Sequence, residues 1–560
     1  MKRYVNELSK FRMNHVGFAR NATKKFVYLG NESNKFSVSK IIDGKILPYC
    51  EGVLEKMDET ELFDSCFVGD ISSINENGLY IIECGNDKSR IFSVYDKIYD
   101  TVCRTLRQYF IWQRCGDDTG WYGNCHHGEK LVDKHGKVHH ISGGHHQSGD
   151  LRKWTFGAAS GVSCLSEYLR RTPPLWNKGD IEYDIAHSVK YYLSLISDEG
   201  YVFDSSFVPF DYDKEKCEGV GMNDYTAFFK PFMYFDTPAP TLGQFAVIRL
   251  LCSASKTLVG YDDELAQKAK DGALTVWNYM INEGLKLPPH DWEIYPPLGH
   301  FAFKQLLFDY FFEDSALTLA TASHTAAFMY RMTNDKKIAD FAAKALEKLC
   351  NLAVYDKDGT LLYFKLCEDE NDSRTAENVT YFPTNIPLCI AECIETFTEH
   401  PDAEKWKKCA IACVKRYEKM ALSNCYGRTT TKIKTDENKN NEWEYETSSS
   451  NDDLAKSALF LVKMCDICEK ESCLATAQRL LDWLVGANPY DSSSIECVGF
   501  NQVRRADFGE FFPGTPQIPG AMGTELHPDV FNSHFGSEYD MPIVGDTLLA
   551  FGLFAAKFNS

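Results

Sequence analysis

The chain has 560 residues, more than one small domain needs, so we expect two or more domains. It contains 44% apolar and 25% charged residues, which is the composition of an ordinary globular protein. Its formal net charge of −19 disfavours nucleic acid and anionic membranes as partners, because binding to phosphate groups needs clustered Lys and Arg.

Membrane-spanning and secretory segments are not expected. No stretch approaches the ~18–20 consecutive apolar residues of a membrane span, and residues 1–10 lack the apolar core of a secretory signal. The 20 cysteines are mostly isolated within apolar segments, which is typical of reduced, buried side chains rather than of a disulfide framework. We therefore expect a cytoplasmic protein with no membrane partner, and the sequence leaves its oligomeric state open.

Residues 1–95 have the pattern of short β-strands. Apolar runs such as 25–29, 78–82 and 91–94 alternate with turn signals such as Asp43-Gly44. Strand-length segments at this spacing predict a small β-sandwich.

From residue 96 to residue 560, apolar residues recur at helical intervals. Leu454, Ala458, Leu461 and Cys465, for example, line one face of a helix. The pattern alone predicts a large all-α domain. The predicted helices span residues 97–113, 154–171, 181–197, 241–259, 263–283, 316–332, 336–352, 386–399, 403–421, 452–469, 473–486 and 543–557.

Long polar or aromatic connections separate these helices, and connections of this length usually carry function. They span residues 114–153, 200–240, 284–315, 356–385, 422–451 and 487–542.

The most informative connection contains the run Ser142-Gly-Gly-His-His-Gln-Ser-Gly-Asp150. Its glycines allow a tight loop that brings the backbone close to a ligand. Two roles are open to Asp150. It is either the N-cap of the helix that begins near Trp154, since Asp is a preferred N-cap, or a functional carboxylate.

Four segments resemble, in chain order, motifs of glycoside hydrolase family 9. Residues 14–18 resemble the Asn-Gln-Val-Gly-Tyr that begins the immunoglobulin-like domain preceding many of its catalytic domains. Residues 142–150 resemble its signature Ser-Gly-Gly-Trp-(Tyr/His)-Asp-Ala-Gly-Asp. Residues 483–489 resemble its Leu-Gly-Arg-Asn-Pro, and residues 535–550 resemble the C-terminal block that carries its catalytic Glu.

The resemblance implies an all-α (α/α)6 toroid over residues 96–560, preceded by an immunoglobulin-like β-sandwich over residues 1–95. It also implies inverting hydrolysis, with Asp150 as general base and Glu538 as general acid, ~6.5–9.5 Å apart. Gln147 replaces the first Asp of the signature, which helps to hold the attacking water. A Gln side chain still forms hydrogen bonds with water but supplies no charge.

Aromatic and basic residues in or beside the long connections are candidates for sugar contacts, because flat rings stack on sugar faces. Each ring could equally pack in the core, and each Arg could equally form a surface ion pair. The candidate substrate-binding residues are His145, Trp154, Trp292, Tyr295, Trp443, Tyr445, Arg504 and Arg505.

A metal site is the remaining expectation. By themselves Cys115, Cys125, His126 and His146 are a weak signal, because a His-rich surface loop explains them as well. Family 9 members with Gln-Arg-Cys-Gly, Cys-His and a His in the signature loop use these side chains to hold a structural zinc. The resemblance therefore implies a zinc ion bound by these four residues, a ligand set that suits a closed tetrahedral site.

We therefore expect a glycoside hydrolase that cleaves a β-linked oligosaccharide. Two alternatives remain. Another (α/α)6 sugar enzyme, such as a lyase or an epimerase, would place Tyr or His opposite Asp150. A non-catalytic glycan-binding descendant would tolerate changes at Glu538.

Overall fold

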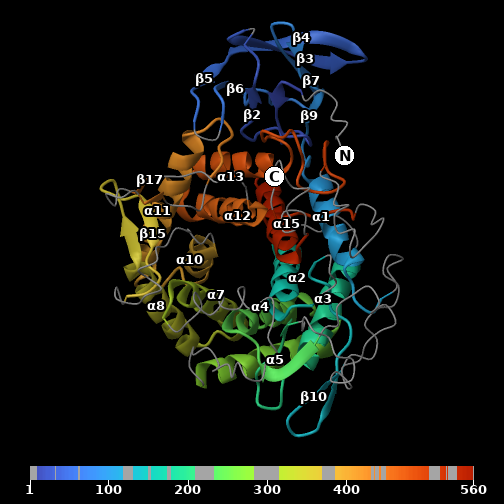
Figure 1. The fold of residues 1–560 in the computed structure, drawn as a ribbon, viewed down its shortest axis with the longest axis vertical. Coiled ribbons are helices and arrows are strands. Elements are labelled where there is room, and N and C mark those ends of the chain that lie inside the picture. Colours follow the sequence, from blue (N-terminus) through green and yellow to red (C-terminus); the bar gives the residue numbers. More distant parts are fainter. Residues whose placement is uncertain are drawn as a thin grey trace.

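The protein consists of a two-sheet sandwich and a ring of helices (Figure 1). The computed structural model describes residues 9–31, 33–60, 63–117, 130–148, 153–172, 178–207, 233–282, 314–368, 385–429, 434–435, 441–442, 450–502, 518–524, 526 and 539–558.

The N-terminal part is a β-sandwich, as the sequence predicts. Its aromatic core lies between two antiparallel sheets; Phe26 of the first sheet contacts Phe36 of the second edge-on, with ring centroids 5.3 Å apart. The first sheet has the order β1 (Phe11–Arg12), β2 (Lys25–Tyr28), β6 (Cys66–Asp70), β5 (Glu55–Met57). The second has the order β4 (Lys45–Val53), β3 (Lys35–Ile42), β7 (Gly78–Cys84), β8 (Asp87–Lys88), with β9 (Phe92–Val94) also paired to β7. The immunoglobulin-like assignment stays a prediction.

The described helices form two concentric rings, which confirms the predicted (α/α)6 toroid (Figure 1). Each inner helix packs on the next, and the last packs on the first, so the inner ring closes. The inner helices are α2 (Thr155–Arg171), α4 (Thr241–Thr257), α7 (Ala316–Thr333), α10 (Asn385–Thr396), α12 (Asn451–Cys468) and α15 (Met541–Ala556). The outer helices are α1 (Asp100–Trp112), α3 (Lys178–Ser194), α5 (Asp263–Asn282), α8 (Lys336–Asn351), α11 (Ala403–Leu422) and α13 (Ser472–Leu484).

Small residues allow the first and last inner helices to approach closely. A Cβ atom on Gly545 of α15 would lie 2.8 Å from the Cα atom of Gly161 in α2. By contrast, outer helix α8 buries one apolar face that includes Leu346 and Leu349, and it exposes lysines on the other. Inner helices are packed on all sides, whereas outer helices cover the core with one face, so only the outer helices need a polar face.

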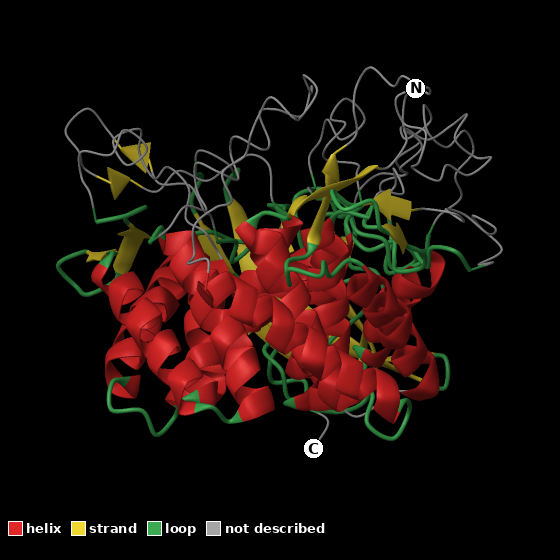
Figure 2. Ribbon diagram, turned by 90° about the horizontal axis from the view of Figure 1, so that it is seen from below, coloured by secondary structure: helices red, strands yellow, loops and turns green. Residues whose placement is uncertain are grey.

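Short and long connections lie at opposite ends of the toroid. Inner helices are followed by outer helices after two residues (334–335) to six residues (172–177), and Figure 2 shows these short turns along one edge of the helix layer. The long connections all precede inner helices, so they emerge at the N-terminal ends of the inner ring. The loops that the sequence predicts to be functional therefore share one end.

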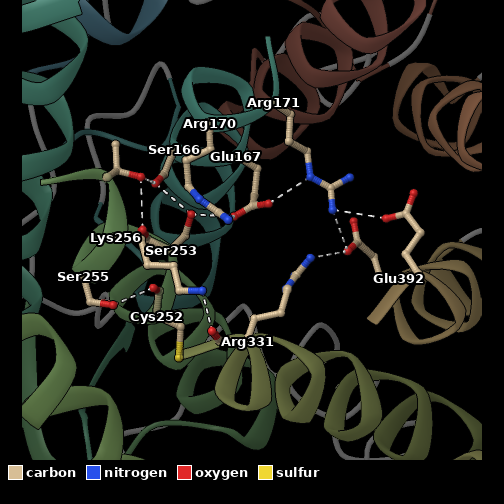
Figure 3. A network of polar contacts seen from close by, with 12 residues as sticks. Ser166, Glu167, Arg170, Arg171, Cys252, Ser253, Ser255, Lys256, Arg331 and Glu392 are labelled. Carbon is tan, nitrogen blue, oxygen red and sulfur yellow. Dashed lines mark hydrogen bonds and ion pairs between the residues drawn. The ribbon is translucent and has the colours of Figure 1, made fainter. Parts of the chain in front are cut away.

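A buried network of charges crosses the other end of the inner ring (Figure 3). Glu392 of α10 forms ion pairs with Arg331 of α7 at 3.1 Å and Arg171 of α2 at 3.4 Å. It also pairs with Lys463 of α12 at 2.6 Å. Arg171 also contacts Glu167 at 3.2 Å. The network joins four inner helices near their C-terminal ends, where the helix dipoles also stabilise positive charge.

The sandwich is attached to the toroid through the predicted segment 14–18. The amide of Asn14 donates to the carboxylate of Asp482 in α13 at 2.7 Å, and the backbone N–H of His15 donates to the carbonyl of Val485 at 2.9 Å. Asp482 is 1% exposed. Burial raises the pKa of Asp482 to about 7, although Asn14 and Gln478 both donate to it.

We expect Asp482→Asn to flatten the pH dependence of stability. Because the folded state holds the proton on Asp482 up to about pH 7, while its usual pKa is 3.8, this residue makes the free energy of unfolding fall as pH rises between these values. An Asn still accepts from Asn14 and carries no charge to bury. The variant should therefore gain stability over wild type above pH 7, by up to about 4 kcal/mol.

Urea unfolding at pH 5 and pH 8 measures the effect. The exposed Asp340 of α8 provides the control, since Asp340→Asn should leave the slope unchanged. A loss of stability in Asp482→Asn at both pH values would contradict the prediction.

Candidate active site

The segments that carry the two predicted catalytic residues are paired. Asp150 and Glu538 lie outside the described residues. The residue two before Asp150 and the residue two after Glu538, Ser148 and Asp540, form an antiparallel β-bridge. Beside it, the backbone N–H of Met541 donates to the carbonyl of Gln147 at 2.9 Å. The two segments are thus joined where α15 begins.

Tyr109 of outer helix α1 contacts both segments of this junction. Its hydroxyl donates to the carbonyl of Gln147 at 3.0 Å, and its ring meets the ring of Tyr539 edge-on, with centroids 5.7 Å apart. Tyr539 is in turn bridged to Gly523. Buried aromatic and backbone contacts therefore hold both segments at this junction.

Gln147 points at the first turn of α2. A Cβ atom on Gly157 would lie 1.8 Å from the Oε1 atom of Gln147, so only glycine leaves room for this side chain. Gln147 is half-buried. The side chain that replaces the Asp of the signature therefore lies against the N-terminal end of an inner helix.

His145 is buried in the packing against α3. It is 0% exposed, its Nδ1 atom is 2.7 Å from the hydroxyl of Ser188, and its Nε2 atom is 3.7 Å from the carboxylate of Asp184. Burial lowers the pKa of His145 to about 4, so the ring is neutral at pH 7. The role of His145 as a sugar contact stays a prediction.

Asp184 anchors the loop that carries His145. It is 0% exposed and contacts Arg107 of α1 at 2.6 Å and Arg114 at 2.5 Å. Burial alone would raise the pKa of Asp184, but His145 and the two arginines together lower it below its usual value. This ionised carboxylate therefore ties α1, α3 and the loop into one unit.

Two of the four predicted zinc ligands are buried on paired segments. Arg114 and His145 form an antiparallel bridge, flanked by hydrogen bonds from the N–H of Cys115 to Gly144 at 2.9 Å and from the N–H of His146 to Gln113 at 2.8 Å. Cys115 and His146 are each 0% exposed. The other two predicted ligands, Cys125 and His126, lie outside the described residues, and the described part of the chain contains no cluster of three or more potential ligands.

Of the other predicted sugar contacts, Trp154 is described. It precedes α2 directly, is half-buried, and meets Phe156 edge-on with ring centroids 5.6 Å apart. Its place before α2 puts it at the end of the toroid where the long connections emerge. The residues outside the described part of the chain are Trp292, Tyr295, Trp443, Tyr445, Arg504 and Arg505.

Tyr109 and Asp184 are supporting residues that the sequence reasoning missed. Tyr109 belongs to an apolar stripe and has no distinguishing signal. Asp184 does have one, because it lies between Ile181 and Ile185 on the buried face of α3, where an unpaired carboxylate would be costly. A carboxylate in that position indicates a buried partner.

The closed double ring of helices, with its functional loops at one end, defines a toroid of the (α/α)6 class. A comparison with models of protein families identifies the family. The model of glycosyl hydrolase family 9 matches residues 99–507, well over half of the chain. The chain belongs to glycosyl hydrolase family 9.

Individual relatives agree with this assignment. A cellodextrinase of Butyrivibrio fibrisolvens is 29% identical over 194 residues, which are 32% of this chain and 33% of the relative. A solved structure of a Bacteroides ovatus family 9 protein superposes with a TM-score of 0.72 at 12% identity, over 98% of this chain and 99% of that chain. A metagenome-derived family 9 endoglucanase superposes with a TM-score of 0.70 at 15% identity, over 97% and 98% of the two chains.

These matches differ in the share of each protein that they cover. The chain covers about a third of the length of the curated cellodextrinase that it matches. The solved structures share the fold. Among the described residues, no helix is long and apolar enough to cross a membrane.

Proposed function

We propose that this protein hydrolyses β-linked oligosaccharides with inversion, with Glu538 as general acid and Asp150 as general base. The observation that carries the proposal is the pairing of Ser148 with Asp540, which brings together the segments leading to the two carboxyl groups. Membership of glycosyl hydrolase family 9 supports the same chemistry.

In the proposed reaction the acid protonates the leaving glycosidic oxygen while the base removes a proton from water. The water attacks the anomeric carbon from the face opposite the leaving group, so the configuration inverts. Gln147 would orient this water through its amide, without adding the charge of a second carboxylate.

Turnover of a panel of short β-linked oligosaccharides, beginning with cellodextrins, tests the proposal. Proton NMR of the first product follows the anomer that is released. The α-anomer from a β-glycoside, with one new reducing end per cleavage, supports inverting hydrolysis. An unsaturated product would indicate a lyase, epimerised sugar without new reducing ends would indicate an epimerase, and binding without turnover would indicate a glycan-binding protein.

We also propose a structural zinc ion held by Cys115, Cys125, His126 and His146. The two described members suit this role, because both are buried on segments that the Arg114–His145 bridge aligns. Bound zinc would fix the loop without taking part in proton transfer. Elemental analysis of the purified protein should find about one zinc per chain, and Cys115→Ser should reduce it; a metal-free, fully folded wild type would contradict the proposal.

Gly157→Ala is expected to lower kcat by about 10–100-fold. The added methyl group displaces Gln147, and a displacement of about 1 Å can reduce the rate by this factor. Stability should be unchanged or slightly higher, since Ala favours a helix. Steady-state kinetics and thermal unfolding measure the two effects.

The matched control is the same substitution in a Gln147→Ala background, where the methyl group meets no side chain. There Gly157→Ala should change kcat little. An equal loss in both backgrounds would show that Gly157 acts through the backbone rather than through Gln147.

A further inference from the structure

Two cysteine thiols meet where the sandwich contacts the toroid. Cys66 is the first residue of β6 in the sandwich and pairs with Met57 of β5. Cys425 follows outer helix α11 in the toroid. Each is 3% exposed, and their side chains are hydrogen-bonded to one another.

Packing on both sides holds these thiols together. The ring of Phe63, three residues before Cys66, lies 4.9 Å from the ring of Tyr426 and 6.3 Å from that of Trp483. Cys66, Phe63, Cys425 and Tyr426 belong to one continuous apolar cluster. The two thiols therefore lie within the packed interface between the sandwich and the toroid.

The backbone around Cys425 is fixed by a hydrogen-bonded turn. The side-chain oxygen of Asn424 accepts from the N–H groups of Tyr426 at 3.2 Å and Arg428 at 3.0 Å. Its amide donates to the carbonyls of Met420 at 3.0 Å and Arg428 at 2.9 Å. Cys425 thus faces Cys66 from a rigid position.

An arginine side chain lies beside this pair of thiols. Arg479 of α13 donates to the carbonyl of Cys425. The hydrogen bond from Cys425 and the charge of Arg479 lower the pKa of Cys66, against the effect of burial. Cys84 of the same sandwich shows the contrast, because burial raises its pKa to about 12. A lowered pKa beside a second thiol favours oxidation of Cys66 over that of Cys84.

We propose that Cys66 and Cys425 form a disulfide bond when the protein meets hydrogen peroxide, and that this bond joins the sandwich covalently to the toroid. The Cys66 thiolate attacks one peroxide oxygen, the O–O bond breaks, and the other oxygen leaves as water after taking a proton. The sulfur of Cys425 then displaces water from the resulting sulfenic acid. Two thiols and one peroxide yield one disulfide and two waters.

The small size of the oxidant matches the burial of the pair. A molecule little larger than water reaches a thiol that is 3% exposed more readily than a bulky thiol reagent does. Neither cysteine contributes to the proposed acid, base or zinc site, so the bond is independent of the proposed hydrolysis.

Peptide mapping of the full-length protein tests the proposal. After exposure to hydrogen peroxide, remaining thiols are alkylated and the protein is digested with trypsin without reduction. We expect the peptide 57–88 to be linked to the peptide 420–428, with fragment ions that assign the link to Cys66 and Cys425. Reduction should separate them.

The peptide 57–88 also contains Cys84, which provides a matched control. Cys84→Ser should keep the linked peptide and Cys66→Ser should lose it. The melting temperature of the oxidised wild type should exceed that of the reduced form, while Cys425→Ser should show no such rise. A link through Cys84, or Cys66 recovered as unlinked thiol or sulfinic acid after peroxide treatment of the wild type, would overturn the proposal.

Discussion

Glu538→Gln and Asp150→Asn are each expected to lower kcat by about 10²–10⁴-fold, the usual contribution of a positioned acid or base. Both replacements keep the shape of the side chain and remove its ability to transfer a proton. The leaving group should separate the two roles. An aryl glycoside with an acidic phenol leaves without protonation, so it should restore much of the rate of Glu538→Gln and little of the rate of Asp150→Asn.

Steady-state kinetics on a cellodextrin and on such an aryl glycoside measure this difference, with circular dichroism to confirm folding. Glu525→Gln serves as the control, because it removes another carboxylate of the same connection. Full activity in Glu538→Gln with a large loss in Glu525→Gln would move the acid to the other residue. Full activity in both would contradict catalysis by this connection.

Glu392→Gln is expected to lower the free energy of unfolding by about 3–5 kcal/mol, the cost of removing one partner from a buried ion pair. Glu392 is 4% exposed and forms ion pairs with Arg171, Arg331 and Lys463, so the substitution removes the carboxylate that these three cations share. Arg171 and Lys463 keep their ion pairs with Glu395. Burial opposes ionisation, but the three cations hold the pKa of Glu392 well below its usual range. Its contribution is therefore present at neutral pH and is lost as pH falls below 4.5 toward that lowered pKa.

Urea unfolding at pH 7 measures this loss. The exposed pair of Glu347 and Lys405 is the control, because Glu347→Gln should cost no more than about 1 kcal/mol. Activity per folded molecule should not change in Glu392→Gln, since the network lies at the end of the toroid away from the long connections. Equal effects of both substitutions would contradict the buried-network interpretation.

The helices could be predicted from the sequence because their apolar stripes have a period that no strand shares. Outer helix α3 shows the limit of this reasoning. It spans Lys178–Ser194 rather than the predicted 181–197, since Asp180 favours the first turn and Ile196 turns away to bridge Val202. A stripe indicates which face is buried but fixes the ends of a helix less well.

The candidate site could be predicted only in part. Motifs predict Asp150 and Glu538 as the catalytic pair, because such chemistry needs two carboxyl groups. They do not reveal contacts between distant segments. The burial of His145 depends on Asp184 and Ser188 of α3, and the support of Gln147 depends on Tyr109 of α1. The cytoplasmic location stays a prediction.

The continuity of the apolar cluster across the sandwich and the toroid has a consequence for how this protein unfolds and how it can be engineered. Phe63, Cys66 and Val68 of the sandwich belong to the same cluster as Trp483 of the toroid. Deleting residues 1–95 would therefore expose apolar surface on α13 instead of releasing an independent catalytic module. Sandwich and toroid should therefore melt in one cooperative calorimetric transition.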